Sequence, residues 1–186
     1  VYHPKGEAVY VHGRSGPGVR ANDRLTVSAP SAESLSVVFH VRTFIYDAAD
    51  VTGVRFRGHE GDDFAQAAGT DDLLLGGAGS DTLDGGNGND ILYSGISGET
   101  GTNVLIGGAG ADRLEGFSGN DTFQGGSGND TIYDSYGGQN EYLFDRGDGR
   151  DIIYAQFGTI RFASGVLPTD VTVRGTSDGL VLSING

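Results

Sequence analysis

The sequence predicts an all-β protein in which a repeat solenoid is flanked by β-rich segments. Glycine accounts for 34 of the 186 residues, well above the roughly 7 % of ordinary proteins. A nine-residue pattern recurs through residues 58–154, and the residues outside it are rich in β-branched and aromatic side chains. We therefore predict a β-rich N-terminal flank or cap over residues 1–57, a repeat block over 58–154 and a C-terminal β capping segment over 155–186.

The repeat block reads as consecutive nonapeptides, of which the copies beginning at Gly76, Gly85, Gly107, Gly116 and Gly125 match one another closely. Short inserts interrupt the count at Ser94–Ser97, Asp134–Ser135 and Asp145. The sixth position always carries an oxygen ligand: Asp63, Asp72, Asp81, Asp90, Asn103, Asp112, Asp121, Asp130, Glu141 and Asp151. The eighth position is always apolar: Ala65, Leu74, Leu83, Leu92, Leu105, Leu114, Phe123, Ile132, Leu143 and Ile153. A solvated disordered tail would not keep this register.

The residue types explain the local structure of each nonapeptide. Glycine in the first six positions permits sharp turns with positive φ, which bring backbone carbonyls inward. The last three positions form a short strand whose middle side chain points to the interior. Each copy therefore combines an oxygen-rich turn with one buried apolar side chain.

The charge is concentrated in the repeats. Residues 58–154 hold 18 acidic and 3 basic residues, whereas residues 1–57 hold 5 and 7 and residues 155–186 hold 2 of each. This distribution argues against nucleic acid and anionic membranes as partners and favours cations. No apolar run approaches the roughly 20 residues of a membrane span. The chain has no Cys, which excludes disulfides and thiolate zinc sites.

The run GGAGSDTLD-GGNGNDILY from Gly76 resembles the haemolysin-type calcium-binding nonapeptides of the RTX (repeats-in-toxin) family of exported bacterial proteins. The resemblance implies a calcium-bound right-handed parallel β-roll, with two nonapeptides per coil and coils stacked about 4.8 Å apart. One implied ladder is Asp63, Asp81, Asn103, Asp121 and Glu141, and the other is Asp72, Asp90, Asp112, Asp130 and Asp151. Residues 162–184 resemble the segment that commonly follows such blocks, which implies a C-terminal cap.

Carboxylate and carbonyl oxygens, without His or Cys in the motif, favour Ca²⁺ over zinc, copper or magnesium. Carboxylates about 4.8 Å apart repel each other by roughly 3–4 kcal/mol at an effective dielectric of 20. We therefore expect metal binding and folding to be one event, with roughly 5–8 ions of the weak extracellular class.

The family pattern adds carbonyl ligands from the first four positions of each turn. The expected metal-binding residues are Asp63, Asp72, Gly76, Gly77, Ala78, Gly79, Asp81, Gly85, Gly86, Asn87, Gly88, Asp90, Asn103, Gly107, Gly108, Ala109, Gly110, Asp112, Gly116, Phe117, Ser118, Gly119, Asp121, Gly125, Gly126, Ser127, Gly128, Asp130 and Asp151. Because Asn103 supplies a neutral oxygen, we expect its site to be weaker.

The flanks read as strands. Residues 158–162, 170–174 and 180–184 alternate in polarity, and Asp178-Gly179 is a hairpin turn signal. In the N-terminal flank, the apolar run 39–46 is expected to be largely buried. This flank forms either a β cap or further coils of the solenoid.

We expect a non-enzymatic module with no catalytic residue, because His3, His12, His40 and His59 form no zinc or protease motif. The chain lacks Met, so we expect a segment of a longer secreted or surface-bound bacterial toxin or adhesin. The resemblance implies calcium-dependent folding outside the cell in support of type I secretion, as a monomer. The alternative is a ligand-binding adhesin surface, on residues 1–57, the Ser94–Ser97 insert or the tyrosines Tyr93, Tyr133 and Tyr136. An ice-binding surface is a weaker alternative, since the outward third positions are irregular.

Overall fold

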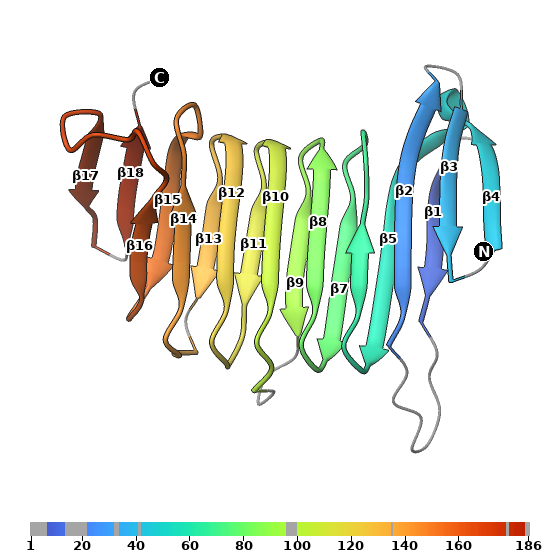
Figure 1. Cartoon of the computed structure of the whole chain (residues 1–186), viewed down its shortest axis with the longest axis horizontal. Helices are drawn as coiled ribbons and strands as arrows, with labels where there is room; N and C mark the ends of the chain where they lie inside the picture. The colour runs from blue at the N-terminus through green and yellow to red at the C-terminus, as the bar shows by residue number, and fades with distance from the viewer. Residues whose placement is uncertain are drawn as a thin grey trace.

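The structure is a computed structural model, and it describes residues 7–13, 22–31, 34–40, 42–95, 100–134, 136–177 and 179–184. In this part of the chain, 18 strands join in one continuous sheet that is wound into a solenoid. The predicted all-β class is confirmed, and so is a parallel solenoid, which has about 6 turns. Figure 1 shows the turns stacked along the long axis of the molecule.

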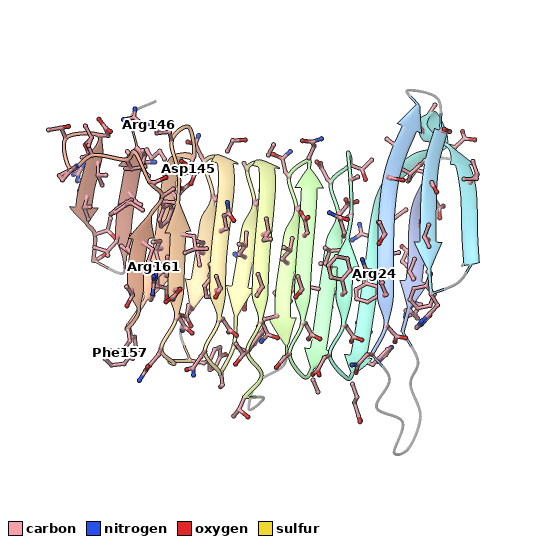
Figure 2. All side chains as sticks on the ribbon, viewed as in Figure 1. Arg24, Asp145, Arg146, Phe157 and Arg161 are labelled. Carbon is pink, nitrogen blue, oxygen red and sulfur yellow. The ribbon has the colours of Figure 1, made fainter. Side chains whose placement is uncertain are left out.

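Consecutive strands of the solenoid lie on opposite faces, and each pairs in parallel with strands of the neighbouring turns. The first face consists of β1 (Glu7–His12), β5 (Val51–Glu60), β7 (Leu73–Ala78), β9 (Ile91–Gly95), β11 (Arg113–Gly116), β13 (Thr131–Asp134) and β15 (Gly149–Ala155). The second face consists of β2 (Arg24–Ser31), β6 (Phe64–Gln66), β8 (Thr82–Asn87), β10 (Val104–Gly110), β12 (Thr122–Gly128), β14 (Glu141–Phe144) and β16 (Thr159–Phe162). Arg24 and Arg161 mark the two ends of this second face, and both are exposed (Figure 2).

The core is a column of apolar side chains between the two faces. The eighth-position residues from Ala65 to Ile132 are all buried, as is Ile153. The register explains this, because Leu74 pairs with Leu92 on one face and Leu83 pairs with Leu105 on the other. Each turn thus adds two apolar side chains to a continuous interior.

The prediction for Leu143 is wrong. Glu141 pairs with Thr122 and Tyr142 pairs with Phe123, so the strand β14 is shifted by one residue from the expected count. The rings of Phe123 and Tyr142 stack in the core with centroids 5.4 Å apart, and Leu143 lies half-buried on the outer side. The stacking of two aromatic rings therefore accompanies the register that the structure adopts.

The N-terminal flank contributes both coils and a cap. β1, β2 and β5 continue the parallel solenoid, and β5 runs across residues 57 and 58. β3 (Ser34–Phe39) and β4 (Arg42–Asp47) then extend β2 as an antiparallel meander, followed by a 3-10 helix at Ala48–Asp50. The expectation that residues 39–46 are largely buried is wrong at Ile45, which is 63 % exposed. Among the described strands, β4 pairs only with β3, so it lies at the edge of the sheet.

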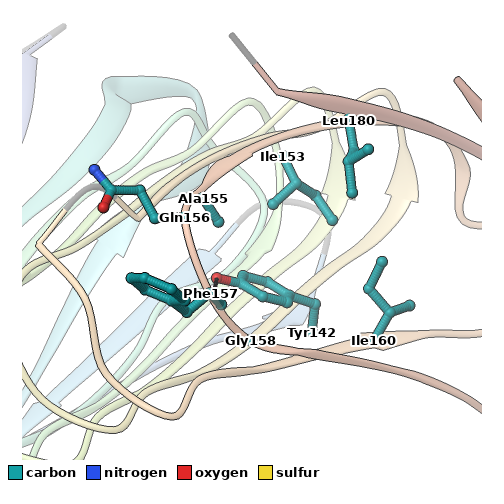
Figure 3. Close-up of a pocket in the computed structure, with 8 residues that line it drawn as sticks. All are labelled: Tyr142, Ile153, Ala155, Gln156, Phe157, Gly158, Ile160 and Leu180. Atoms are coloured by element: carbon teal, nitrogen blue, oxygen red, sulfur yellow. Dashed lines mark hydrogen bonds between the residues drawn. The ribbon is translucent and has the colours of Figure 1, made fainter. Parts of the chain in front are cut away.

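At the other end, β16 is the last parallel strand, and β17 (Val171–Gly175) and β18 (Leu180–Ile184) form an antiparallel pair. β18 also pairs antiparallel with β15, which buries Leu182 completely. The three predicted C-terminal strands are thus present, and the turn residue Asp178 lies outside the described residues. A shallow pocket of about 150 Å³ remains at this end, lined by residues that include Tyr142, Ile153, Ile160 and Leu180 (Figure 3).

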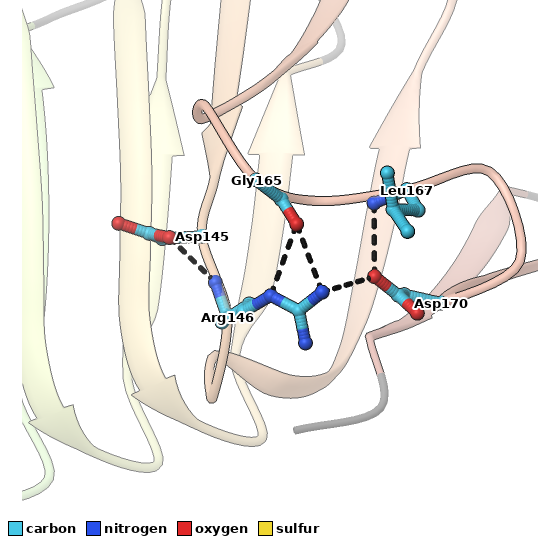
Figure 4. Close-up of polar contacts among 5 residues, drawn as sticks. All are labelled: Asp145, Arg146, Gly165, Leu167 and Asp170. Carbon is cyan, nitrogen blue, oxygen red and sulfur yellow. Dashed lines mark hydrogen bonds and ion pairs between the residues drawn. The ribbon is translucent and has the colours of Figure 1, made fainter.

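Arg146 ties the capping segment to the last repeats. Its guanidinium donates to the carbonyl oxygen of Gly165 at 2.8 and 3.0 Å and pairs with Asp170 at 2.6 Å (Figure 4). The same Asp170 carboxylate accepts the backbone N–H of Leu167 at 2.9 Å. The loop between β16 and β17 is therefore fixed to the turn that precedes β15.

Replacing Leu105 by alanine tests the core. We expect Leu105→Ala to lower the free energy of unfolding by about 2–5 kcal/mol, since a fully buried side chain leaves a cavity. Chemical denaturation in saturating calcium measures this loss. The neighbouring Ile106→Ala is the matched control, because Ile106 is half-buried and faces outward. Equal losses in the two variants would contradict the assigned core.

Candidate metal centre

The first ladder is a chain of side-chain-to-backbone hydrogen bonds between turns. The Oδ1 atom of each sixth-position residue accepts the backbone N–H of the equivalent residue one turn earlier. Asp63 N–H donates to Asp81 at 2.8 Å, Asp81 N–H to Asn103 at 2.8 Å and Asn103 N–H to Asp121 at 2.9 Å. The ladder therefore stacks without a break across the insert at residues 94–97, although Ile96 and Ser97 lie outside the described residues.

The second ladder has the same geometry. It runs through Asp72, Asp90, Asp112, Asp130 and Asp151, with N–H···Oδ1 distances of 2.8 to 2.9 Å. The N–H of Val54 donates to Asp72 at 2.6 Å and begins this row. Every member that the sequence places in this ladder lies in it.

The placement of Glu141 in the first ladder is wrong. Asn140 takes that place, since its Oδ1 accepts the N–H of Asp121 at 2.6 Å. Glu141 instead faces outward and pairs with Arg161 at 2.8 Å. The one-residue shift of β14 moves the amide of Asn140 inward and the longer carboxylate out.

The second carboxylate oxygen of these residues is the unusual feature. The Oδ2 atoms are buried, and they have no hydrogen-bond partner in the described part of the chain: Asp63, Asp72, Asp81, Asp90, Asp112, Asp121 and Asp130. A buried carboxylate oxygen without a partner costs several kcal/mol of effective desolvation. Such a row requires a counter-charge when the carboxylates are ionised.

The first-position glycines form a cradle for these oxygens. A Cβ atom on Gly76 would overlap Oδ2 of Asp81 and the carbonyl oxygen of Ser94. The same pair of oxygens, a carboxylate and a carbonyl from the next turn, meets at Gly58, Gly85 and Gly107. Oxygens from two turns thus converge at these four first positions, which is the donor chemistry that Ca²⁺ prefers.

The turns add further carbonyls. Gly79 has a φ of 133° and Gly110 a φ of 146°, which only glycine adopts readily. A Cβ on either would collide with the carbonyl of the equivalent glycine one turn earlier, Gly61 or Gly88. In contrast, the carbonyls of Ala78 and Ala109 already accept backbone N–H groups at 2.8 Å. Among the described residues, no three acidic or histidine side chains form a metal cluster.

Burial perturbs the ladder carboxylates. Desolvation raises the pKa of Asp72, Asp81, Asp90, Asp130 and Asp151 to about 7 and that of Asp63 and Asp121 to about 6. Hydrogen bonds from backbone N–H groups lower the pKa in part, and for most of these carboxylates repulsion from neighbouring carboxylates raises it further. The ionised ladder is therefore unfavourable in the folded protein without a cation.

Sequence reasoning missed Asp23, which extends the first ladder by one turn. Its N–H donates to Oδ1 of Asp63 at 2.6 Å, and its carboxylate pairs with His40 at 2.6 Å. The signal was present, because Asn22-Asp23-Arg24-Leu25 has the same order of an acid, a spacer and an apolar residue as Asp112-Arg113-Leu114. Val19 and Ala21 stand where most repeats carry glycine, at the second and fourth positions, and this hid the match.

The fifth positions form an exposed outer row of hydrogen bonds beside each buried ladder. Asp71 accepts the N–H of Asn89 at 2.8 Å, and Asn89 in turn accepts the N–H of Ala111 at 2.9 Å. Asn120 and Asn129 accept N–H groups of the following turns in the same way. These exposed bonds hold the turns in register beside the buried ladders.

Two of the three predicted tyrosine candidates stack on other aromatic rings. Tyr133 stacks on Tyr154 at 4.9 Å between centroids, and the guanidinium of Arg113 lies 4.0 Å from its ring. Tyr136 is 55 % exposed and stacks on Phe117 at 5.4 Å.

No helix in the described part of the chain is long and apolar enough to cross a membrane.

The fold and the two buried oxygen ladders define a parallel β-roll whose turns present an all-oxygen, calcium-type donor set. Residues 67–96 and 97–132 match the family model of the RTX calcium-binding nonapeptide repeat (4 copies), so this part of the chain consists of RTX repeats. The RTX repeats imply calcium binding. No curated protein and no solved structure matches the chain.

The raised pKa values predict a pH dependence for the calcium-free protein. The folded-state pKa values of about 6 to 7 exceed the unfolded value of about 3.9, so between these values the folded state binds more protons. Its stability should rise as the pH falls. In EGTA, we expect a stronger β signal in circular dichroism at pH 5.5 than at pH 7.5. An equal or weaker signal at pH 5.5 would contradict the assigned burial of the ladders.

Proposed function

We propose that this chain is a calcium-dependent folding module of a secreted bacterial protein of the toxin or adhesin type, exported by a type I system. The observation that carries the proposal is the double row of buried carboxylate oxygens without hydrogen-bond partners in the described part of the chain. An ion that binds between turns supplies the counter-charge that these oxygens lack. The module itself is not an enzyme.

The physical basis is the balance between repulsion and burial. Each turn brings carboxylates close to those of the turns before and after it, and each nonapeptide buries one aliphatic or aromatic side chain, worth about 1.5–3 kcal/mol. Ordering the glycine-rich turns opposes folding, because glycine loses more conformational freedom than any other residue. Calcium converts the repulsion into attraction, so the folded state depends on the calcium concentration.

This dependence suits export. Sites of the extracellular class bind with dissociation constants on the order of 10⁻⁴–10⁻³ M, which are not reached in a cytosol with scarce calcium. The chain therefore stays unfolded during passage through a secretion channel and folds outside. Folding against β18, which covers β15, then opposes backward movement of the chain.

A calcium titration tests the proposal. We expect little β structure in excess EGTA at pH 7.5 and a cooperative gain of circular dichroism signal at millimolar calcium, since neighbouring turns stabilise each other. Magnesium at the same concentration is the control and should produce little change. A native β signal that persists in EGTA at this pH would refute calcium-dependent folding.

Substitution of one ladder aspartate distinguishes calcium binding at specific sites from an effect of the net charge. We expect Asp112→Asn to raise the calcium midpoint by about tenfold or more, as losses at metal sites do, because its buried Oδ2 is removed. Glu141→Gln removes the same charge from an outward position and should leave the midpoint nearly unchanged. Equal shifts would indicate that net charge alone governs folding.

The C-terminal cap has its own test. Truncation after Phe162 removes β17 and β18 and exposes the edge of β15. We expect the calcium midpoint to rise or the transition to disappear, since a solenoid needs a covered end. An unchanged titration would show that the cap plays no part in calcium-induced folding.

A further inference from the structure

The turn between β13 and β14 reverses the residue pattern of the other turns. In the five closely matching copies a glycine stands first and an aspartate sixth, as in Gly116 and Asp121. Here Asp134 pairs with Gly116 and so stands first, and Asn140 takes the ladder position. In this turn the carboxylate therefore stands at the first position, and an amide stands at the ladder position.

Asp134 is fixed in the interior. Its side chain alternates inward with that of Ile132, and the residue is only 1 % exposed. Its Oδ2 accepts hydrogen bonds from the Nδ2 of Asn140 and the hydroxyl of Tyr142. The Tyr142 hydroxyl also lies 3.2 Å from the carbonyl oxygen of Phe157, so its one proton is shared between the two acceptors. Asn140 and Tyr142 therefore hold the Asp134 carboxylate in one orientation.

The other oxygen of Asp134 resembles the ladder oxygens. Oδ1 is buried and has no hydrogen-bond partner among the described residues, and the same is true of Oδ2 of Asp121. Two observations place the carboxylates of Asp134 and Asp121 close together. The Asn140 side chain accepts the N–H of Asp121 through its Oδ1 and donates to Asp134 through its Nδ2. A Cβ atom on Gly116, the strand partner of Asp134, would lie 3.2 Å from Oδ2 of Asp121. A proton on Oδ1 would also lack an acceptor, whereas a cation would satisfy both oxygens.

We propose that Asp134 is a calcium ligand that replaces the sixth-position aspartate at the C-terminal end of the first ladder, in a site shared with Asp121. The inference rests on the proposed calcium binding of the repeats and adds a site beyond residue 132, where the family match ends. The carboxylate now comes from the end of strand β13 and not from the turn. The first row of sites is thereby extended into the turn between β13 and β14.

The number of bound ions tests the proposal. Equilibrium dialysis of the full chain against calcium, followed by atomic absorption, should give about one ion fewer for Asp134→Gly than for the unchanged protein. The double variant Asp134→Gly with Asn140→Asp restores the regular turn and should regain the ion. Glu141→Gln is the control for charge and should bind the full number. Equal numbers for Asp134→Gly and the unchanged protein would overturn this inference alone, whereas no binding by the unchanged protein would refute the proposed function.

Terbium luminescence gives a second measurement that needs no Asp134 variant. Tb³⁺ takes the place of Ca²⁺, and a nearby tyrosine sensitises its emission. Because the Tyr142 hydroxyl touches Asp134, we expect Tyr142→Phe to lower the emission of the folded protein. Tyr10→Phe, on β1 at the opposite end, should not. Equal emission in the two variants would overturn the assignment.

Discussion

The structure depends on one interaction, the hydrogen bond from a backbone N–H to the Oδ1 atom of an aspartate in the next turn. It recurs along both ladders at nearly constant length. It ties consecutive turns together at the point where each strand begins. Because only one carboxylate oxygen is used in this way, the same bond leaves the other oxygen buried and without a partner in the described residues.

The glycine content follows from this arrangement. The unpaired oxygen of Asp90 lies where a Cβ atom of Gly85 would stand, so the carboxylate of Asp90 excludes a side chain at Gly85. The stacked carbonyls impose the same restriction on Gly88 and Gly110, whose φ angles are positive. Composition, charge and backbone conformation are therefore consequences of packing oxygens from adjacent turns close together.

The sequence predicted most of the ladders and the core because the nine-residue phase is visible in both the aspartates and the apolar residues. The prediction failed where an insert makes the nine-residue register ambiguous, or where packing between distant residues determines the structure. Asn140 and Glu141 are adjacent oxygen-bearing residues after an insert, and only the stacking of Tyr142 on Phe123 separates them. Asp23 is not preceded by the full glycine pattern, since Val19 and Ala21 stand at the second and fourth positions. The exposure of Ile45 reflects the position of β4 at the edge of the sheet. These features depend on neighbours distant in the chain.

The two ends of the solenoid are closed by antiparallel strands on opposite faces. β3 and β4 extend the face of β2 at the N-terminal end, while β18 and β17 extend the face of β15 at the C-terminal end (Figure 1). These additions bury apolar side chains such as Val37 and Leu182, and their burial requires no cation. The ends can therefore contribute calcium-independent stability, whereas the central turns hold the unpaired carboxylates. Since each turn contacts only its neighbours, a folded end provides the template on which calcium orders the next turn.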